Sequence, residues 1–340
     1  MANLSIGIVG MPNVGKSTLF NALLKKQAAL EANYPFATIE PNVGIIEVPD
    51  ERLPKLAEIV KTNKIVPAVV EFVDIAGLVR GASKGEGLGN KFLAHIREVA
   101  AIVHVVRLFE DSDIIHVENK VDPKSDIETI ETELILADLQ TLSKQREPKG
   151  TSASKEAVST YAVVQRLKEG LNQGIPLRNQ KLNDEDREMI QQLNLLTIKP
   201  VIYAFNCSLD QLETKEEVLS RIMKYELGIK NLILFNPLED ETLNVLISKA
   251  YETLGLISFL TAGEKEVRAW TIQNGQNAVE ASGVIHTDFM KKFIKADISS
   301  YQDFVDSNGW NGAREKGKVQ IVGKDHIMQE GDVVEFKIGA

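Results

Sequence analysis

The segment 10–17, Gly-Met-Pro-Asn-Val-Gly-Lys-Ser, constrains the fold of this chain more than any other feature. It fits the pattern G-x-x-x-x-G-K-[ST], and it stands between a short apolar run at residues 6–9 and a helix-like stretch that starts at Ser17. Glycines let the backbone curl so that several N–H groups point inward at a phosphate, and the positive end of the following helix adds to that field. The sequence therefore predicts a phosphate-binding loop (P-loop) in an α/β domain.

Each residue type in this loop suits the binding of a Mg²⁺-nucleotide. We expect Lys16 to reach the β- and γ-phosphates and the Ser17 hydroxyl to bind Mg²⁺. The remaining predicted nucleotide contacts of the loop are Asn13, Val14, Gly15 and Thr18. In some P-loop relatives an asparagine at the position of Asn13 helps to hold K⁺ against the phosphates. K⁺ is therefore a candidate cofactor beside Mg²⁺, and an ordinary loop residue is the alternative.

A second motif supplies further candidates for the metal site. Asp74 ends the strand-like run 69–74, and Gly77 follows it in the pattern D-x-x-G. In a P-loop fold this acid holds Mg²⁺, usually through water, and the glycine amide senses the γ-phosphate. Thr38 lies between the two motifs, where a switch threonine completes the Mg²⁺ shell. The predicted metal ligands are therefore Ser17, Thr38 and Asp74, and Gly77 joins the predicted nucleotide contacts.

Other positions bear on which nucleotide is bound and how fast it is hydrolysed. Leu78 stands where many P-loop GTPases use a glutamine to orient the attacking water, which predicts slow hydrolysis or another catalytic group. Asn206, a further predicted nucleotide contact, ends the fourth strand-like run, but Leu209 takes the place of the aspartate that pairs with guanine in N-K-x-D. Leaving buried guanine donors unpaired would cost about 1–3 kcal/mol, which argues against strong guanine specificity. Asp210 stands one residue late, and a GTPase with a remodelled base pocket is the alternative.

The hydrophobic pattern changes twice along the chain. Residues 1–127 alternate apolar runs with helix-like stretches, which indicates a parallel α/β sheet, and the pattern resumes in residues 197–257. Between them, residues 128–196 show apolar side chains at three- and four-residue spacing on both sides of a polar break, which predicts an inserted helical hairpin. Residues 258–340 contain strand-like runs and a short helical segment, as in a small α+β module.

Composition narrows the class of protein. The chain has no run of eighteen apolar residues, and its single cysteine, Cys207, excludes an internal disulfide. The first residues lack the basic region of a secretory signal, so we expect a cytoplasmic protein without a membrane partner. Net charge is −9, and Lys plus Arg number 10 against 12 Asp plus Glu in residues 258–340, which argues against a generally basic nucleic-acid binder.

Several of these runs together resemble the YchF-type Obg-like ATPase family, translation-associated P-loop NTPases with a TGS domain. The matching segments are residues 10–22, 34–42, 72–79, 259–272 and 283–289. The resemblance covers nearly the whole chain. It implies an Obg-type G domain in residues 1–127 and 197–257, an inserted coiled-coil hairpin in 128–196, and a TGS domain with a ubiquitin-like β-grasp fold in 258–340.

The resemblance also implies an activity and partners. These are ATP preferred over GTP, a hydrophobic residue in place of the catalytic glutamine, and association with ribosomes in translation and stress control. RNA contact through the TGS domain or the hairpin goes with them, and the proposed catalytic histidine of the family falls on His116. The family usually has N-x-x-E where this chain has residues 206–209, and the stretch from Asn206 to Phe259 looks shorter than in the family. A nucleotide-gated ribosome- or RNA-binding module with little or no hydrolysis is the alternative function.

Overall fold

The computed structural model describes residues 4–27, 42–76, 88–110, 121–148, 154–225 and 231–339. The chain forms two compact units. Among the described residues, the first unit contains 4–24, 42–44 and 71–246, and the second contains 25–27, 45–70 and 247–339.

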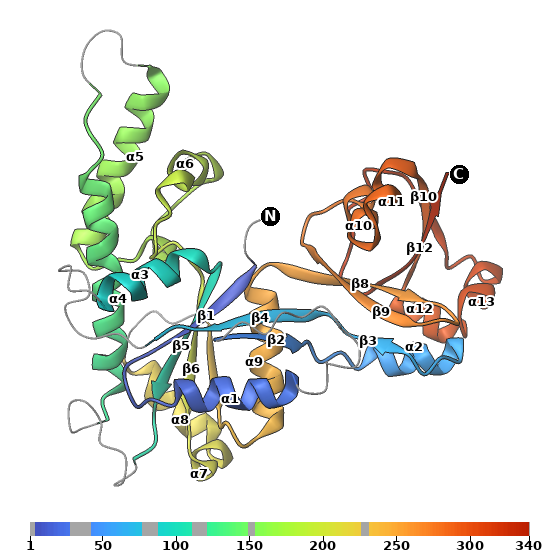
Figure 1. Cartoon of the computed structure of the whole chain (residues 1–340), viewed down its shortest axis with the longest axis horizontal. Helices are drawn as coiled ribbons and strands as arrows, with labels where there is room; N and C mark the ends of the chain where they lie inside the picture. Colours follow the sequence, from blue (N-terminus) through green and yellow to red (C-terminus); the bar gives the residue numbers. More distant parts are fainter. Residues whose placement is uncertain are drawn as a thin grey trace. The chain divides into compact units, whose positions relative to one another are not determined.

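A six-stranded sheet organises the first unit, with strand order β2-β4-β1-β5-β6-β7 (Figure 1). Its strands are β1 (Ser5–Val9), β2 (Val43–Glu47), β4 (Val69–Asp74), β5 (Ala101–Arg107), β6 (Val201–Asn206) and β7 (Leu232–Phe235). Strand β1 pairs in parallel with β4 and β5, β5 with β6, and β6 with β7. Every residue of β1, β5 and β6 is buried, as expected for parallel strands covered on both faces. The predicted α/β sheet is confirmed, and its strands from β4 to β7 in the sheet order are parallel.

Helices connect these strands. They are α1 (Lys16–Gln27), α3 (Leu88–Glu98), α7 (Leu209–Glu213), α8 (Lys215–Met223) and α9 (Asp240–Thr253), the last of which ends in the second unit. Helix α1 begins directly after the glycine loop, so its N-terminal N–H groups face the position where the loop would hold a phosphate.

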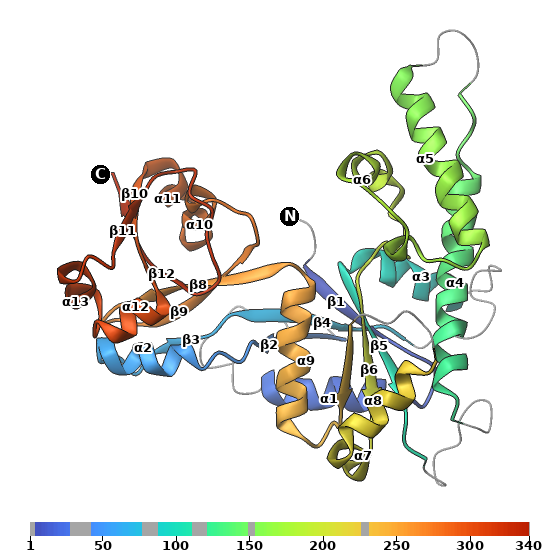
Figure 2. The same cartoon turned by 180° about the vertical axis from the view of Figure 1, so that it is seen from behind.

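The inserted hairpin is confirmed as two long helices, α4 (Pro123–Ser143) and α5 (Lys155–Asn172). Helix α4 starts where the Asp122 carboxylate accepts a bond from the Ser125 N–H, and proline at the first helical position suits that start. The two helices share an apolar core with the short elements η2 (Leu177–Asn179), α6 (Asp184–Ile190) and η3 (Gln191–Leu193). Figure 2 shows α5 projecting away from the sheet of this unit.

The second unit contains a mixed sheet with strand order β11-β10-β12-β8-β9-β3. Its strands are β3 (Ile65–Val66), β8 (Leu256–Ala262), β9 (Val267–Gln273), β10 (Phe293–Ser300), β11 (Gln320–Val322) and β12 (Asp332–Ile338). Strand β12 runs parallel to β8, which forms an antiparallel hairpin with β9, and β10 is antiparallel to both β11 and β12. A first hairpin at one side and the last strand in the centre is the arrangement of a β-grasp sheet, which confirms the fold expected for this part of the chain.

The helices of the second unit pack around this sheet. They are α2 (Arg52–Val60), α10 (Ala278–Ile285), α11 (Thr287–Lys292), α12 (Tyr301–Asp306) and α13 (Trp310–Glu315). Asn277 and Glu280 form a reciprocal capping box that starts α10, whose Ala278 and Ala281 enter the core beside Phe259.

Residues 45–70 belong to the second unit, although the sequence places them within the first domain. The reason is a set of contacts distant in sequence, since β3 pairs in parallel with β9 at Ile65 and Val267. The division of the chain at residues 127, 197 and 257 stays a prediction.

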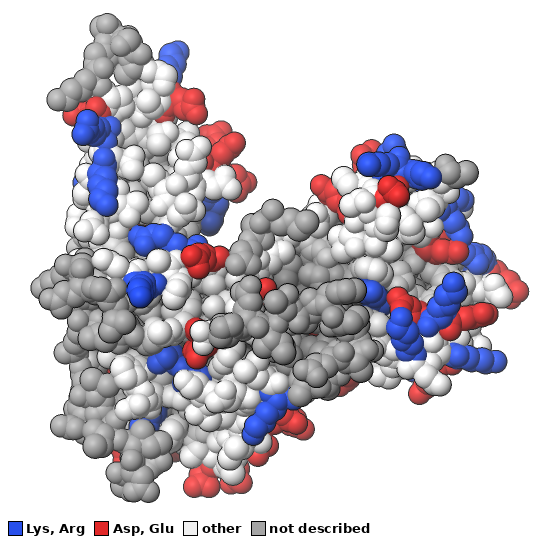
Figure 3. Space-filling view, in the orientation of Figure 1, with Lys and Arg blue, Asp and Glu red and all other residues white. Residues whose placement is uncertain are grey.

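Surface charge is mixed, with Lys and Arg interspersed among Asp and Glu over the face drawn in Figure 3. Within the described ranges, no helix combines the length and apolar character that crossing a membrane requires.

Candidate nucleotide-binding site

The glycine loop between β1 and α1 is packed so closely that two of its positions require glycine. A Cβ atom on Gly10 would lie 2.6 Å from the Val105 carbonyl oxygen. Gly15 has φ +100°, and a Cβ atom there would lie 2.3 Å from the Asn206 amide nitrogen. Asn13 also has a positive φ, 63°, which asparagine tolerates better than most residues. The loop conformation therefore depends on the residue types that the motif specifies.

Lys16 lies buried at the first position of α1 and bonds back to its own loop. Its Nζ donates to the Met11 carbonyl oxygen at 2.7 Å. Burial lowers the pKa of Lys16 to about 8, and the nearby charge of Asp74 opposes that shift. An ammonium group that has lost most of its water and holds only a carbonyl can exchange that partner for phosphate oxygens at small cost.

Asp74 stands at the end of β4, and the parallel register of β4 with β1 places it opposite Ile8. The backbone N–H of Asp74 donates to the Asn42 carbonyl at 2.9 Å, which fixes the strand end. Burial raises the pKa of the Asp74 carboxyl, and the Lys16 ammonium opposes the shift. A half-buried carboxylate with an incompletely compensated charge suits a divalent cation, which would favour its ionised form.

Asn206 holds the loop from the end of β6. Its amide nitrogen donates to the Val14 carbonyl oxygen at 3.1 Å, and both residues are buried. The next residue, Cys207, is held in turn by Asn236, whose amide nitrogen donates to the Cys207 carbonyl at 2.8 Å. The amide of Asn206 therefore acts on the loop backbone, and the residue also lines the cavity described next.

These elements surround a cavity of about 680 Å³, which we call the phosphate-loop cavity. It is lined by Asn13, Gly15, Lys16, Ser17, Thr18, Phe109, Glu110, Asn206, Cys207, Ser208, Asn236, Pro237 and Leu238. The structure thus brings six predicted nucleotide contacts to one cavity, while Val14 is buried beneath the loop and contributes its carbonyl to Asn206. Ser17 and Thr18 are exposed and free to meet a ligand and its metal.

Comparison with known proteins agrees with this geometry. A family model described as "50S ribosome-binding GTPase" matches residues 5–137, and the YchF-GTPase_C model, described as "Protein of unknown function (DUF933)", matches residues 256–339. The "Ribosome-binding ATPase YchF" of Bacillus subtilis is 46% identical over 98% of this chain and 99% of its own length. The protein of the same name from Haemophilus influenzae is 47% identical over 97% of this chain and 98% of its own length. This chain belongs to the YchF family.

A solved YchF structure confirms the architecture. The structure titled "Structure of the Schizosaccharomyces pombe YchF GTPase" has a TM-score of 0.87, is 38% identical, and matches 99% of this chain and 98% of its own. The sheet orders and the inserted hairpin therefore describe a YchF fold over the full length.

The residues that follow β6 differ from the N-K-x-D pattern used for guanine recognition. Leu209 and Asp210 occupy the first turn of α7, where Ser208 caps the helix and Leu209 is 48% exposed. Within the described part of the chain, neither residue belongs to the cavity wall. The wall is formed by residues 206–208 and 236–238 at the ends of β6 and β7.

The sequence indicates a nucleotide-loop region around residues 236–239 only loosely, and it does not predict Phe109 or Glu110 as wall residues. A usable signal was the apolar run 232–235 followed by Asn236-Pro237, because ligands in open α/β sheets bind beyond the carboxyl ends of the strands.

Four predicted positions lie outside the described residues: Thr38, Gly77, Leu78 and His116. Among the residues that the structure does describe, no three His, Cys, Asp or Glu side chains are arranged to hold a metal ion. The predicted Mg²⁺ site is of a different kind, since it uses Ser17, Asp74, Thr38 and nucleotide oxygens.

Proposed function

We propose that this YchF-family protein binds ATP with Mg²⁺, hydrolyses it slowly, and associates with ribosomes as a regulator of translation and stress responses. The observation that carries the proposal is a glycine loop fastened by Asn206, with the buried Lys16 ammonium and the Asp74 carboxylate close enough to influence each other's pKa. Relatives from Bacillus subtilis, Haemophilus influenzae and Escherichia coli O157:H7 carry the name "Ribosome-binding ATPase YchF".

In this proposal each residue has a defined task. Lys16 leaves the Met11 carbonyl and binds the β- and γ-phosphates. Ser17, Thr38 and Asp74 hold Mg²⁺, which when bound neutralises part of the phosphate charge. Backbone groups at Asn13, Val14, Gly15, Thr18 and Gly77 complete the phosphate contacts.

The proposal includes a preference for adenine over guanine. Its support is that Leu209 and Asp210 lie in a helix turn that does not line the cavity, so neither supplies an acceptor for guanine N–H groups there. The Schizosaccharomyces pombe relative is titled a GTPase, so the base needs a direct test.

Slow hydrolysis follows from Leu78, because leucine cannot orient the attacking water by hydrogen bonding. His116 is our candidate for the catalytic group, and K⁺ beside Asn13 is our candidate for additional positive charge. A His116→Ala protein should lose turnover while keeping ATP affinity, and turnover should be faster in K⁺ than in Na⁺ buffer. Equal turnover in the two buffers would remove K⁺ from the mechanism.

The deciding experiment is an equilibrium titration of one preparation with ATP, GTP and ADP, each with and without Mg²⁺. We expect ATP to bind more tightly than GTP, Mg²⁺ to strengthen ATP binding, and Lys16→Ala to abolish it. GTP binding at least as tight as ATP binding would reverse the base assignment in favour of a GTPase.

Association with ribosomes is tested by cosedimentation of the wild type and Lys16→Ala proteins with purified 70S ribosomes. Nucleotide-dependent sedimentation supports a switch, whereas normal sedimentation of Lys16→Ala together with absent turnover supports a binding module. RNA contact by the β-grasp unit or the hairpin, and a cytoplasmic location, belong to the same proposal.

A further inference from the structure

Strands β2 and β4 are neighbours in the first sheet and form a two-stranded ribbon. The Asp74 N–H donates to the Asn42 carbonyl at 2.9 Å, and the Val48 N–H donates to the Ala68 carbonyl at 2.8 Å. Both pairs have the same sum of residue numbers, so the strands run antiparallel without a slip between them. The two pairs lie six residue steps apart, with five residues between them on each strand, a length of about 20 Å. We call this segment, residues 42–48 with 68–74, the ribbon.

One face of the ribbon is buried from the pair Gly44 and Phe72 to the pair Val48 and Ala68. Ile46, Val70 and Phe72 are at most 2% exposed, and Val48 and Ala68 continue the same alternation toward the other end. A slip of one residue would turn this apolar face outward, so the register is strongly specified. The position of Asp74 therefore depends on the register of the whole ribbon.

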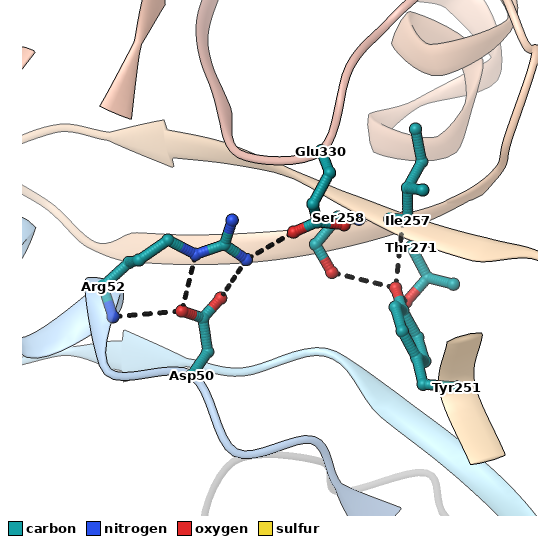
Figure 4. Close-up of polar contacts among 7 residues, drawn as sticks. All are labelled: Asp50, Arg52, Tyr251, Ile257, Ser258, Thr271 and Glu330. Carbon is teal, nitrogen blue, oxygen red and sulfur yellow. Dashed lines mark hydrogen bonds and ion pairs between the residues drawn. The ribbon is translucent and has the colours of Figure 1, made fainter. Parts of the chain in front are cut away.

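The far end of the ribbon leads into α2 and β3, which are fastened to the β-grasp unit. Arg52 donates through Nε and Nη2 to the Asp50 carboxylate, each at 2.8 Å, and Nη2 also reaches Glu330 (Figure 4). The second carboxylate oxygen of Glu330 accepts the Ser258 N–H at 2.8 Å, so the cluster is tied to β8.

A second fastening lies at β3. The Val267 N–H donates to the Lys64 carbonyl at 2.9 Å, and the Lys64 ammonium lies 2.6 Å from Glu266. These two groups of contacts attach both parts of the segment that connects the ribbon strands, α2 and β3, to the β-grasp unit.

We infer that the ribbon couples the β-grasp unit to the Mg²⁺ end of the nucleotide site. While Arg52 and β3 hold the far end, the ribbon keeps the register in which Asp74 lies opposite Ile8 and bonded to Asn42. Loosening the far end lets the ribbon fray and lowers the affinity that depends on Asp74. By reciprocity, Mg²⁺-nucleotide stabilises the attachment of residues 50–66 to the β-grasp unit, and a partner that binds this unit changes nucleotide affinity. The inference rests on the proposed function, since it concerns the regulation of that site.

The test compares Arg52→Met with a matched control, Arg314→Met. Arg314 is also an arginine of the β-grasp unit that bonds carboxylates, Glu335 at 2.7 Å and Asp297 at 3.5 Å, and none of its bonds to described residues reaches the ribbon. ATP affinity is measured for each protein with Mg²⁺ and with EDTA. We expect Arg52→Met to weaken binding by about fivefold or more with Mg²⁺ and to leave binding in EDTA unchanged. Arg314→Met should change neither, and an equal gain from Mg²⁺ in wild type and Arg52→Met would overturn the coupling.

Two further measurements keep the result decisive. If thermal unfolding shows that Arg52→Met has lost the β-grasp fold, Glu330→Gln replaces it in the affinity test, because this variant retains the Arg52–Asp50 pair. In an Asp74→Asn background the effect of Arg52→Met should disappear, and its persistence there would show that the path does not run through Asp74.

Failure of the proposed function gives a result that differs from failure of the coupling. Wild-type protein that binds GTP and not ATP contradicts the ATP assignment, and the same comparison made with GTP then decides the coupling. Hydrogen exchange at the Val48 and Val267 amides should slow when Mg²⁺-nucleotide is added, and unchanged exchange at both would also overturn the inference.

Discussion

Replacement of Asn206 by alanine tests whether this side chain serves the loop or the base. The substitution removes the donor that binds the Val14 carbonyl at 3.1 Å, and Val14 is fully buried, so water cannot take the donor's place. An orphaned buried acceptor costs about 1–3 kcal/mol, which corresponds to a loss of about five- to 150-fold in an equilibrium constant. Because the lost contact is made to the loop backbone, which serves the phosphates common to both nucleotides, the loss should be the same factor for ATP and GTP.

The assay is equilibrium titration of Asn206→Ala with both nucleotides in the presence of Mg²⁺. Asn183→Ala serves as the control, because Asn183 caps α6 and does not line the cavity, and its loss should affect thermal stability without changing nucleotide affinity. A change of more than about threefold in the ratio of ATP to GTP affinity would show that Asn206 reads the base. Unchanged affinity for both nucleotides would refute the proposed role of the Asn206–Val14 bond in shaping the site.

Other predictions follow from single residues of the first unit. Burial lowers the pKa of Lys16 to about 8, so the charged fraction of this side chain falls as the pH rises through 8. ATP affinity should therefore drop by up to about tenfold from pH 7 to pH 9, and equal affinities at the two pH values would contradict this prediction. Arg178→Met removes the cation paired with the partly buried Glu131 carboxylate, which keeps only the Tyr203 hydroxyl of these two partners, and should cost about 2–3 kcal/mol in urea unfolding. Arg166→Met removes an exposed ion pair and should cost at most about 1 kcal/mol. Leu209→Glu adds an acid at an exposed helix N-terminus, so the temperature of thermal unfolding should not fall. The ratio of ATP to GTP affinity should change by no more than about threefold, and a larger change would place residue 209 at the base.

Much of the first unit could be predicted because its signals are local. Strand β4 coincides with the expected run 69–74, and β1 begins one residue before the expected run 6–9. Buried parallel strands are short uninterrupted apolar runs, and such runs can be recognised without knowledge of their partners. The two hairpin helices were equally visible, because apolar side chains recur along them at helical spacing.

Residues 45–70 show where local signals end. Strand β3 has only two residues, and its partner Val267 lies about two hundred positions away along the chain. The ion pair of Arg52 with Glu330 spans 278 positions. Neither contact leaves a periodic pattern in the sequence, so the membership of this segment in the β-grasp unit could not be foreseen.

The sequence by itself determined that this chain has a phosphate loop, because glycine, lysine and serine at fixed spacing act through backbone geometry and charge that neighbouring residues supply. Only the tertiary structure decided what Asn206 does. Its amide meets the Val14 carbonyl across 192 positions, after β6 has been placed beside β5 and β5 beside β1. The wall formed by residues 236–238 is of the same kind, since it exists only where β7 ends next to β6. A loop of eight residues carries its own chemistry, whereas a cavity needs surfaces that folding brings together from distant parts of the chain.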